Sequence, residues 1–386
     1  MRAVRATVCA TSLLAALAAC GGGGGGATPS PQPTPVETPS SYAYLQDVSA
    51  SSAVVCRYAP GGELYTLEWS LATTWSPLGR ATETEVRSNH ALRMAPLAAD
   101  TSYRYRLRAP GGSLLAEGVV STAPPALSRP VTFALISDSG WQGQAAAEGY
   151  VAEAIRLSNP APELLLHAGD VVYPSGEREN YPTGLFQPFA RVIDHVPFFP
   201  TVGNHDLETE NGAPWNEMFV TPANNPPKNP RYYSFDWGDV HFAAIDVAST
   251  AHAPGSVLWN WLSEDLRATR AGWKVVYLHY PPWSCGLNGS SADVQRTLVP
   301  LFEATAVDVV IGGHDHSYQR FHRRAGILYL VSGGGGAPPD PVGDCSGLAF
   351  ARSVNHFLRG RAEARTLLLE AIGTDGVVIE SVLLQH

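Results

Sequence analysis

The sequence is poor in cysteine and in basic residues, and its N-terminal apolar run is too short for a membrane-spanning helix. Its 26 basic residues stand against 35 acidic ones, which gives a net charge of −9. This balance argues against nucleic acid as a general partner, because such a partner calls for a basic face. Of five cysteines, Cys56, Cys285 and Cys345 follow the N-terminal segment. In an oxidising compartment Cys285 and Cys345 can pair, which leaves Cys56 over.

The N-terminal segment has the pattern of a secretory signal, expected at residues 1–19. Two arginines precede a short apolar centre, and small residues follow it. Leu17–Cys20 resembles a bacterial lipobox, which makes Cys20 the expected lipidation site; the alternative is an ordinary cleavable signal. Residues 20–40 are rich in Gly and Pro, so we expect a disordered tether. The expected location is secreted, in the bacterial cell envelope, as an outer-membrane lipoprotein held by its lipid or in the periplasm.

About 345 residues follow the tether, a length suited to two domains. Residues 41–124 alternate short strand patterns with Gly and Pro turns. Tyr103, Tyr105 and Leu107, for example, alternate with arginines, as in a half-buried strand. Regular strands of this kind predict an antiparallel β-sandwich, and the stretch resembles a fibronectin type III-like module. Residues 125–130 are the expected linker.

Residues 131–386 read as a second, α/β domain in which strand-like runs repeatedly end in polar residues. Val131–Ser137, a helix expected over Ala145–Leu157, and the run Leu164–Leu166 form a βαβ unit. Later runs end at Asn204, His279 and His314 in the same way. The polar residues that follow these runs are Asp138, Asp170, Tyr173, Asn204, His205, Asp206, His279, His314 and His316.

Taken alone, Asp170 at the end of its strand has two readings. One is a turn or helix cap, which Asp favours; the other is a metal ligand at the carboxyl edge of a sheet. Because the ends of parallel strands meet at one edge, the loops can converge on one pocket, and the whole set favours the ligand. One carboxylate can bridge two cations while leaving positions for water and substrate.

This motif set resembles the calcineurin-like metallophosphoesterase superfamily, and within it the purple acid phosphatases. The resemblance implies a two-sheet αββα sandwich preceded by the all-β sandwich domain, and phosphomonoester hydrolysis as an acid phosphatase. It implies a first metal held by Asp138, Asp170, Tyr173 and His316. Asp170 bridges to a second metal, which is completed by Asn204, His279 and His314. The phenolate of Tyr173 favours Fe(III), and the family pairs that iron with a divalent Fe, Zn or Mn.

The resemblance also assigns the catalytic roles. A metal-bound hydroxide attacks the phosphorus while His205 neutralises charge on the substrate phosphate, and Asp206 orients His205. Asn204 and Asn288 complete the expected substrate-binding residues. Asn288 stands nine residues after His279, where family members often have a His that protonates the leaving group. Since Asn cannot act as an acid, we expect slower hydrolysis of alkyl than of aryl phosphates.

Two other functions remain open from the sequence. A phosphodiesterase is possible on the same metals, and a surface binding protein with a vestigial site is possible if the β module carries the function. The complete ligand set argues against the second alternative.

Overall fold

The structure is a computed structural model that describes residues 42–61, 63–143 and 147–386, all within one unit spanning residues 33–386. The predicted signal, Cys20 and the tether lie outside the described residues. Within the described ranges, no helix is both long and apolar enough to cross a membrane.

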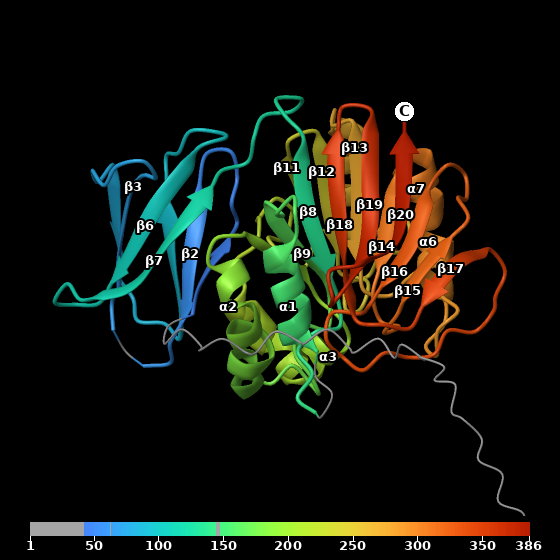
Figure 1. Ribbon diagram of the computed structural model, residues 1–386, viewed down its shortest axis with the longest axis horizontal. Helices are drawn as coiled ribbons and strands as arrows, with labels where there is room; N and C mark the ends of the chain where they lie inside the picture. Colours follow the sequence, from blue (N-terminus) through green and yellow to red (C-terminus); the bar gives the residue numbers. More distant parts are fainter. Residues whose placement is uncertain (1–41, 62, 144–146) are drawn as a thin grey trace, which may run out of the picture. The chain divides into compact units, whose positions relative to one another are not determined.

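The N-terminal part consists of two antiparallel sheets (Figure 1). Alternating buried and half-exposed residues along β6 explain why one face packs inward: Tyr103, Tyr105 and Leu107 are buried. One sheet has the order β1 (Ala43–Gln46), β2 (Ala53–Tyr58), β5 (Asn89–Met94), and the other β4 (Gly79–Thr82), β3 (Thr66–Leu71), β6 (Ser102–Arg108), β7 (Leu114–Ser121). The all-β content agrees with the expectation, while the boundaries at 124 and 131 stay a prediction.

This β part is joined to the rest by buried hydrogen bonds. The Tyr44 hydroxyl donates to the carbonyl of Met218 at 2.7 Å, and the Asn89 amide donates to the same oxygen at 3.0 Å. The Tyr105 hydroxyl donates to the carbonyl of Asp194 at 2.9 Å.

The remainder is built on two larger sheets, as the sequence predicted. The first has the order β10 (Phe198–Thr201), β9 (Leu164–Ala168), β8 (Val131–Ile136), β18 (His356–Glu363), β19 (Thr366–Gly373), β20 (Val378–Gln385). The second has the order β11 (Tyr233–Trp237), β12 (Val240–Ile245), β13 (Trp273–Leu278), β14 (Val309–Gly312), β16 (Leu328–Ser332), β15 (Tyr318–Phe321), β17 (Leu348–Arg352). In the first sheet β8, β9 and β10 are parallel, and in the second β12, β13, β14 and β16 are parallel.

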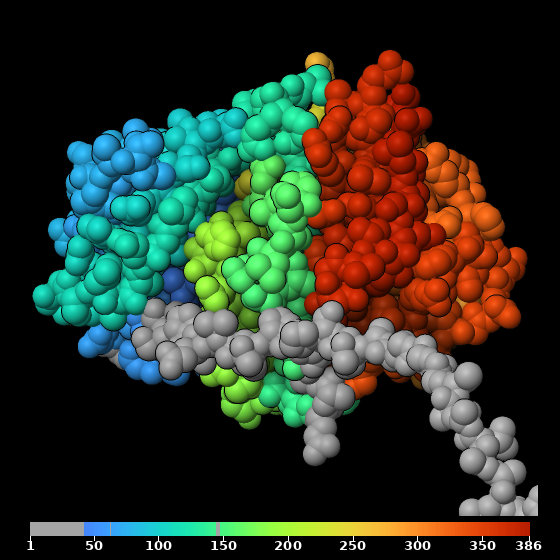
Figure 2. Space-filling model, in the orientation of Figure 1, coloured from blue at the N-terminus to red at the C-terminus, as the bar shows by residue number. Residues whose placement is uncertain are grey.

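Strand β8 explains the layering, because it is buried on both faces. Phe133 and Leu135 join the core between the two sheets, whereas Ala134 and Ile136 pack with the helices of the outer layer. That layer holds α1 (Glu148–Leu157) and α2 (Gln187–Ile193), and α1 contacts β18 and β19. On the face drawn in Figure 2, α1 in green lies beside the C-terminal strands in red.

The second sheet is covered in the same way by α5 (Val257–Ala268), α6 (Ala292–Thr297) and α7 (Val299–Ala304). Leu258, Leu262 and Leu266 recur on one face of α5 and are buried against the sheet. The result is four layers, helix–sheet–sheet–helix, which confirms the predicted αββα sandwich. The remaining short helices are α3 (His205–Glu208), α4 (Ala213–Met218), and the single turns at Arg178–Asn180, Pro182–Phe186 and Glu210–Gly212.

A disulfide joins Cys285, in the loop after β13, to Cys345, in the loop between β16 and β17. This is the pairing that the sequence allowed, and Cys56 is a buried free thiol.

Candidate metal centre

The polar residues predicted from the sequence follow the carboxyl ends of five parallel strands. Asp138 follows β8, Asp170 follows β9, Asn204 follows β10, His279 follows β13 and His314 follows β14. The first three belong to one sheet and the last two to the other. The edges of both sheets therefore supply side chains to one site, which is where ligands bind in open α/β sheets.

Three of these residues have a left-handed backbone. The φ angles are 60° at Asp138, 55° at Asp170 and 72° at His314. Such conformations cost free energy for residues other than Gly and concentrate at functional sites. The left-handed backbone at these strand ends thus directs the side chains toward the site.

Three acceptor groups surround the hydroxyl of Tyr173. Its hydroxyl oxygen lies 3.2 Å from Oδ1 of Asp138, 3.0 Å from Oδ2 of Asp170 and 3.1 Å from Nε2 of His316. Nδ1 of His316 faces the carbonyl of Pro338 at 3.1 Å, so it carries the proton and Nε2 holds a lone pair. One phenolic proton cannot satisfy three acceptors, whereas a cation among them can. The donor set therefore fits a metal ion.

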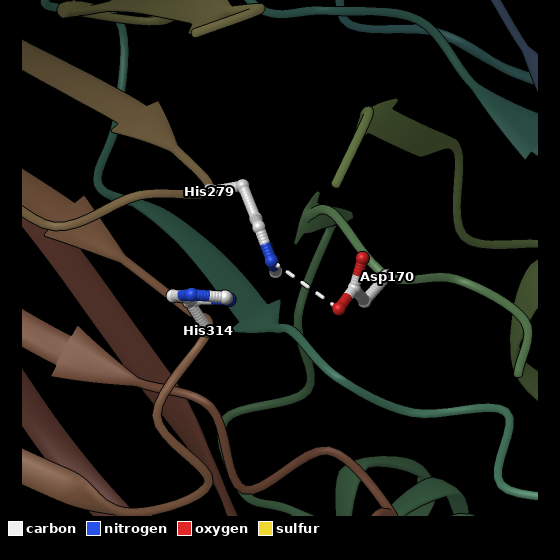
Figure 3. A group of neighbouring side chains, drawn as sticks. All are labelled: Asp170, His279 and His314. Atoms are coloured by element: carbon white, nitrogen blue, oxygen red, sulfur yellow. Dashed lines mark ion pairs between the residues drawn. The ribbon is translucent and has the colours of Figure 1, made fainter. Parts of the chain in front are cut away.

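A second cluster has the same chemistry. Nδ1 of His279 faces the carbonyl of Ala168 at 3.0 Å, and Nε2 faces Oδ1 of Asn204 at 3.1 Å and Oδ2 of Asp170 at 3.2 Å. Asp170, His279 and His314 offer ligand atoms within 4.8 Å of one another, and Figure 3 shows their side chains directed toward a common space. Asp170 lies between the two clusters, the position that a bridging carboxylate needs.

The pKa shifts describe how the site balances its charge without metal. Burial would lower the pKa of His279, but the charge of Asp170 raises it to about 9, so a proton stands in for a cation. Burial and the charge of His279 lower the pKa of His314 to about 3, which leaves that imidazole neutral. Burial, together with Asp170 and Asp138, raises the pKa of Tyr173 well above its usual value, so a phenolate there needs a nearby cation.

Glycines let the loops approach closely. A Cβ on Gly203 would lie 2.1 Å from Oδ1 of Asp170, and a Cβ on Gly313 would lie 2.0 Å from Oγ of Ser137. Neither contact is tolerable, so these positions require Gly. Ser137 donates a hydrogen bond from its hydroxyl to the carbonyl of Gly169 at 3.0 Å.

His205 lies at the exposed side of the site. Its ring is 4.6 Å from that of Tyr173, its Nε2 is 4.0 Å from Oδ2 of Asp170, and 34% of its side chain is exposed. Nδ1 faces the carbonyl of Pro174 at 2.5 Å. The ring is thus held by the backbone, with Nε2 left toward the candidate metals and solvent.

The hydrogen bonds that Asp206 accepts in the described structure come from backbone N–H groups, and its orientation of His205 stays a prediction. Its buried carboxylate accepts hydrogen bonds from the N–H groups of Gly203 and Val171, both at 2.9 Å. Burial and the charge of Asp170 raise the pKa of Asp206 to about 7. The side chain therefore ties the loop after β10 to the loop after β9, and the contact that holds Nδ1 of His205 is the carbonyl of Pro174. Sequence reasoning missed Pro174, as it missed Ala168 and Pro338, because a backbone acceptor leaves no side-chain signature.

Asn288 lies in the loop after β13, near His314. Its side-chain amide donates to the carbonyl of His314 at 2.8 Å, and its own N–H donates to Oδ1 of Asp315 at 2.8 Å. One N–H of the amide holds the loop, so substrate contact through Asn288, which stays a prediction, falls to its second N–H or to Oδ1.

A two-sheet sandwich whose strand edges gather carboxylates, imidazoles, an amide and a phenol defines the class of metallophosphoesterases. Residues 131–318 match the family described as calcineurin-like phosphoesterase. This stretch is therefore similar to calcineurin-like phosphoesterases, and purple acid phosphatases are among the proteins to which the chain is similar.

Individual relatives give the extent of the similarity. A protein of Mycobacterium tuberculosis is 27% identical over 294 residues, which cover 67% of this chain and 55% of that protein. Purple acid phosphatase 18 of Arabidopsis thaliana is 30% identical over 269 residues, which cover 64% of this chain and 58% of that protein. The chain thus spans little more than half the length of these relatives.

Among solved structures, a purple acid phosphatase from yellow lupin (Lupinus luteus) seeds has a TM-score of 0.78 at 18% identity. The match covers 89% of this chain and 74% of that one. At this identity the similarity concerns the fold, and it extends over both the β part and the sandwich.

Proposed function

We propose that this chain is a dinuclear metal phosphatase that releases inorganic phosphate from phosphate monoesters. The observation that carries the proposal is the position of Asp170. Its Oδ2 lies 3.0 Å from the Tyr173 hydroxyl and 3.2 Å from Nε2 of His279, so one carboxylate belongs to two ligand clusters. Similarity to purple acid phosphatases supports the same activity.

The proposed ligands follow the two clusters. Asp138, Asp170, Tyr173 and His316 would hold Fe(III), and Asp170, Asn204, His279 and His314 a divalent Fe, Zn or Mn. A phenolate is a hard anionic ligand, which favours the trivalent ion at the first position. When bound, such a metal pair lowers the pKa of a coordinated water and neutralises charge on the phosphate.

The residues of the chain set the geometry of the reaction. The Ala168 and Pro338 carbonyls hold Nδ1 of His279 and of His316, so each ring presents Nε2 to a metal. His205, held through Nδ1 by Pro174, can donate from a protonated Nε2 to a phosphate oxygen and stabilise the charge that develops there.

Hydrolysis assays on the metal-loaded protein test this function. We expect phosphate release from p-nitrophenyl phosphate, much slower cleavage of bis(p-nitrophenyl) phosphate, and loss of both on chelation. The reverse preference would replace the proposal with a phosphodiesterase. A protein that binds two metals per chain and hydrolyses neither ester would contradict an enzymatic role and favour a surface binding protein.

We further propose that Cys20 carries a lipid that holds the protein at the bacterial cell envelope. The lipobox-like sequence supports this location. Cys20→Ser should move the full-length protein from the membrane fraction to the soluble fraction, and an unchanged distribution would contradict the anchor.

A further inference from the structure

Asp315 is a fully buried carboxylate between His314 and His316 that no described function uses. Its Oδ1 accepts the N–H of Asn288 at 2.8 Å, and its Oδ2 accepts the hydroxyl of Ser284. In the described part of the chain, no basic nitrogen lies within ion-pair distance of it. Burying a carboxylate without a cationic partner costs free energy. The hydrogen bonds of Asp315 are therefore expected to serve the position of the segments that donate them.

The hydrogen bonds hold the loop 283–290 that follows His279. Oε1 of buried Gln319 accepts the N–H of Cys285 at 2.7 Å, and its amide donates to the hydroxyl of Ser284 at 3.0 Å. The same amide donates to the hydroxyl of Ser317 at 3.1 Å. Asp315 and Gln319 together form a polar network beneath the loop.

The loop in turn holds the backbone of His314. The side chain of Asn288 donates to the His314 carbonyl at 2.8 Å, and Gly286 packs so closely that a Cβ there would lie 2.3 Å from Cγ of Asp315. The loop after β13 and the turn after β14 are thereby closed on each other. His279 lies at the start of the loop after β13, and His314 lies in the turn after β14. The centroids of the two rings are 5.0 Å apart.

We propose that Asp315 is a positioning residue for the metal centre, acting by docking the 283–290 loop so that His279 and His314 face the same ion. The inference rests on the metal centre of the proposed function. It concerns the chain's affinity for metal and not the chemistry on phosphate. Groups that orient metal ligands typically change metal affinity 10–100-fold when they are removed.

Asp315→Asn and Ser284→Ala test the role: the first replaces one acceptor oxygen of the carboxylate with an NH₂ donor, and the second removes the hydroxyl that donates to Asp315. Asp265→Asn and Ser234→Ala are matched controls, because the Ser234 hydroxyl on β11 donates to Oδ1 of Asp265 on α5 at 2.9 Å, in a pair that includes no candidate ligand. The readouts are metal content per chain, the Kd for Zn²⁺ by chelator competition, and the melting temperature of the metal-free chain.

We expect Asp315→Asn to raise the Kd of the second metal about 10–100-fold, and Ser284→Ala to raise it by a smaller factor. The controls should lower the melting temperature with a Kd within about twofold of wild type. Ser284→Ala keeps the carboxylate and provides the test if Asp315→Asn does not fold. Variants that lose stability but keep the wild-type Kd would overturn the role of Asp315. A wild-type chain that binds no metal would instead overturn the proposed function itself.

Discussion

The hydroxyl of Tyr173 lies 3.0 Å from Oδ2 of Asp170, three residues earlier on the same loop after β9. The two side chains are almost completely buried, and the same hydroxyl also faces Asp138 and His316. Since a phenol has one proton, it cannot satisfy all three acceptors, whereas a cation placed among them can. Tyr173 and Asp170 are therefore the residues on which predictions about metal binding depend most directly.

Tyr173→Phe should remove the proposed phenolate ligand while keeping the ring that packs against Trp141 and His205. In iron-loaded protein we expect loss of the visible absorption band and weaker retention of the first metal. The metal-free chain should change in stability by only about 1 kcal/mol, the value of one hydrogen bond. An unchanged spectrum in a protein that still holds iron would exclude Tyr173 as a ligand.

Asp170→Asn should affect both metals, because the carboxylate belongs to both clusters. We expect metal content to fall below one ion per chain and phosphatase activity to drop by more than about 100-fold. Asp236→Asn is a suitable control, since that carboxylate is largely exposed and lies on β11. Loss of only one metal would show that Asp170 does not bridge.

His205→Ala should lower kcat by about 10²–10³-fold and leave metal content unchanged, because Nδ1 of the imidazole faces a backbone carbonyl and Nε2 lies 4.0 Å from Oδ2 of Asp170, beyond hydrogen-bond distance. Glu208→Gln is the control: its carboxylate is half-exposed and 3.5 Å from the same ring, so it should have little effect. If His205→Ala instead released metal, the residue would have to be counted among the ligands.

The sequence predicted the strands that carry the site better than it predicted those behind them. The predicted runs Val131–Ser137 and Leu164–Leu166 correspond to β8 and β9 within one or two residues, because apolar runs bounded by turn residues leave few alternatives. Strands β15 and β17 were not predicted. Tyr318–Phe321 is only four residues long, and Leu348–Arg352 is half-exposed at the edge of its sheet, so neither has a clear periodicity.

In the candidate site, too, some features could be predicted from the sequence and others could not. Asp170 and His279 could be identified because each follows an apolar strand, and position after a strand is a local property of sequence. The partners of Asp206 and Asp315 could not, since Val171 and Asn288 reach them through backbone N–H groups from other loops. Such contacts depend on how two loops meet, which periodicity does not encode.

His241 should make stability depend on pH. Its ring lies between Asp236 at 2.7 Å and Asp265 at 2.9 Å. Burial would lower the pKa of His241, but the two carboxylates raise it to about 9, above the value of about 6.5 for an unfolded chain. The ion pairs therefore contribute fully below pH 6.5, and the contribution is lost as the pH rises through about 9.

The measurement is the difference in unfolding free energy between wild type and His241→Gln as a function of pH, in which other titrating groups cancel. We expect wild type to lose on the order of 2 kcal/mol relative to the variant between pH 6.5 and 9.5. A difference that stays constant over this range would mean that His241 is neutral in the folded protein.

The Cys285–Cys345 disulfide should stabilise the fold because it closes a long loop, and this stabilisation rises with the logarithm of the loop length. The two cysteines are 60 residues apart, and loop-closure entropy for that separation predicts about 4 kcal/mol. Reductant should therefore lower the melting temperature of wild type by about 5 °C. Cys56 is buried and unpaired, so it adds no second reducible bond among the described residues.

The double variant Cys285→Ala/Cys345→Ala separates the bond from other effects of reductant. It should melt at the temperature of reduced wild type and respond no further to reductant. Because Cys285 also donates its N–H to Gln319 beneath the 283–290 loop, metal affinity should be retained in the variant if the polar network alone docks that loop. A variant that lost metal together with the disulfide would show that the covalent bond, rather than Asp315 and Gln319, holds the loop in place.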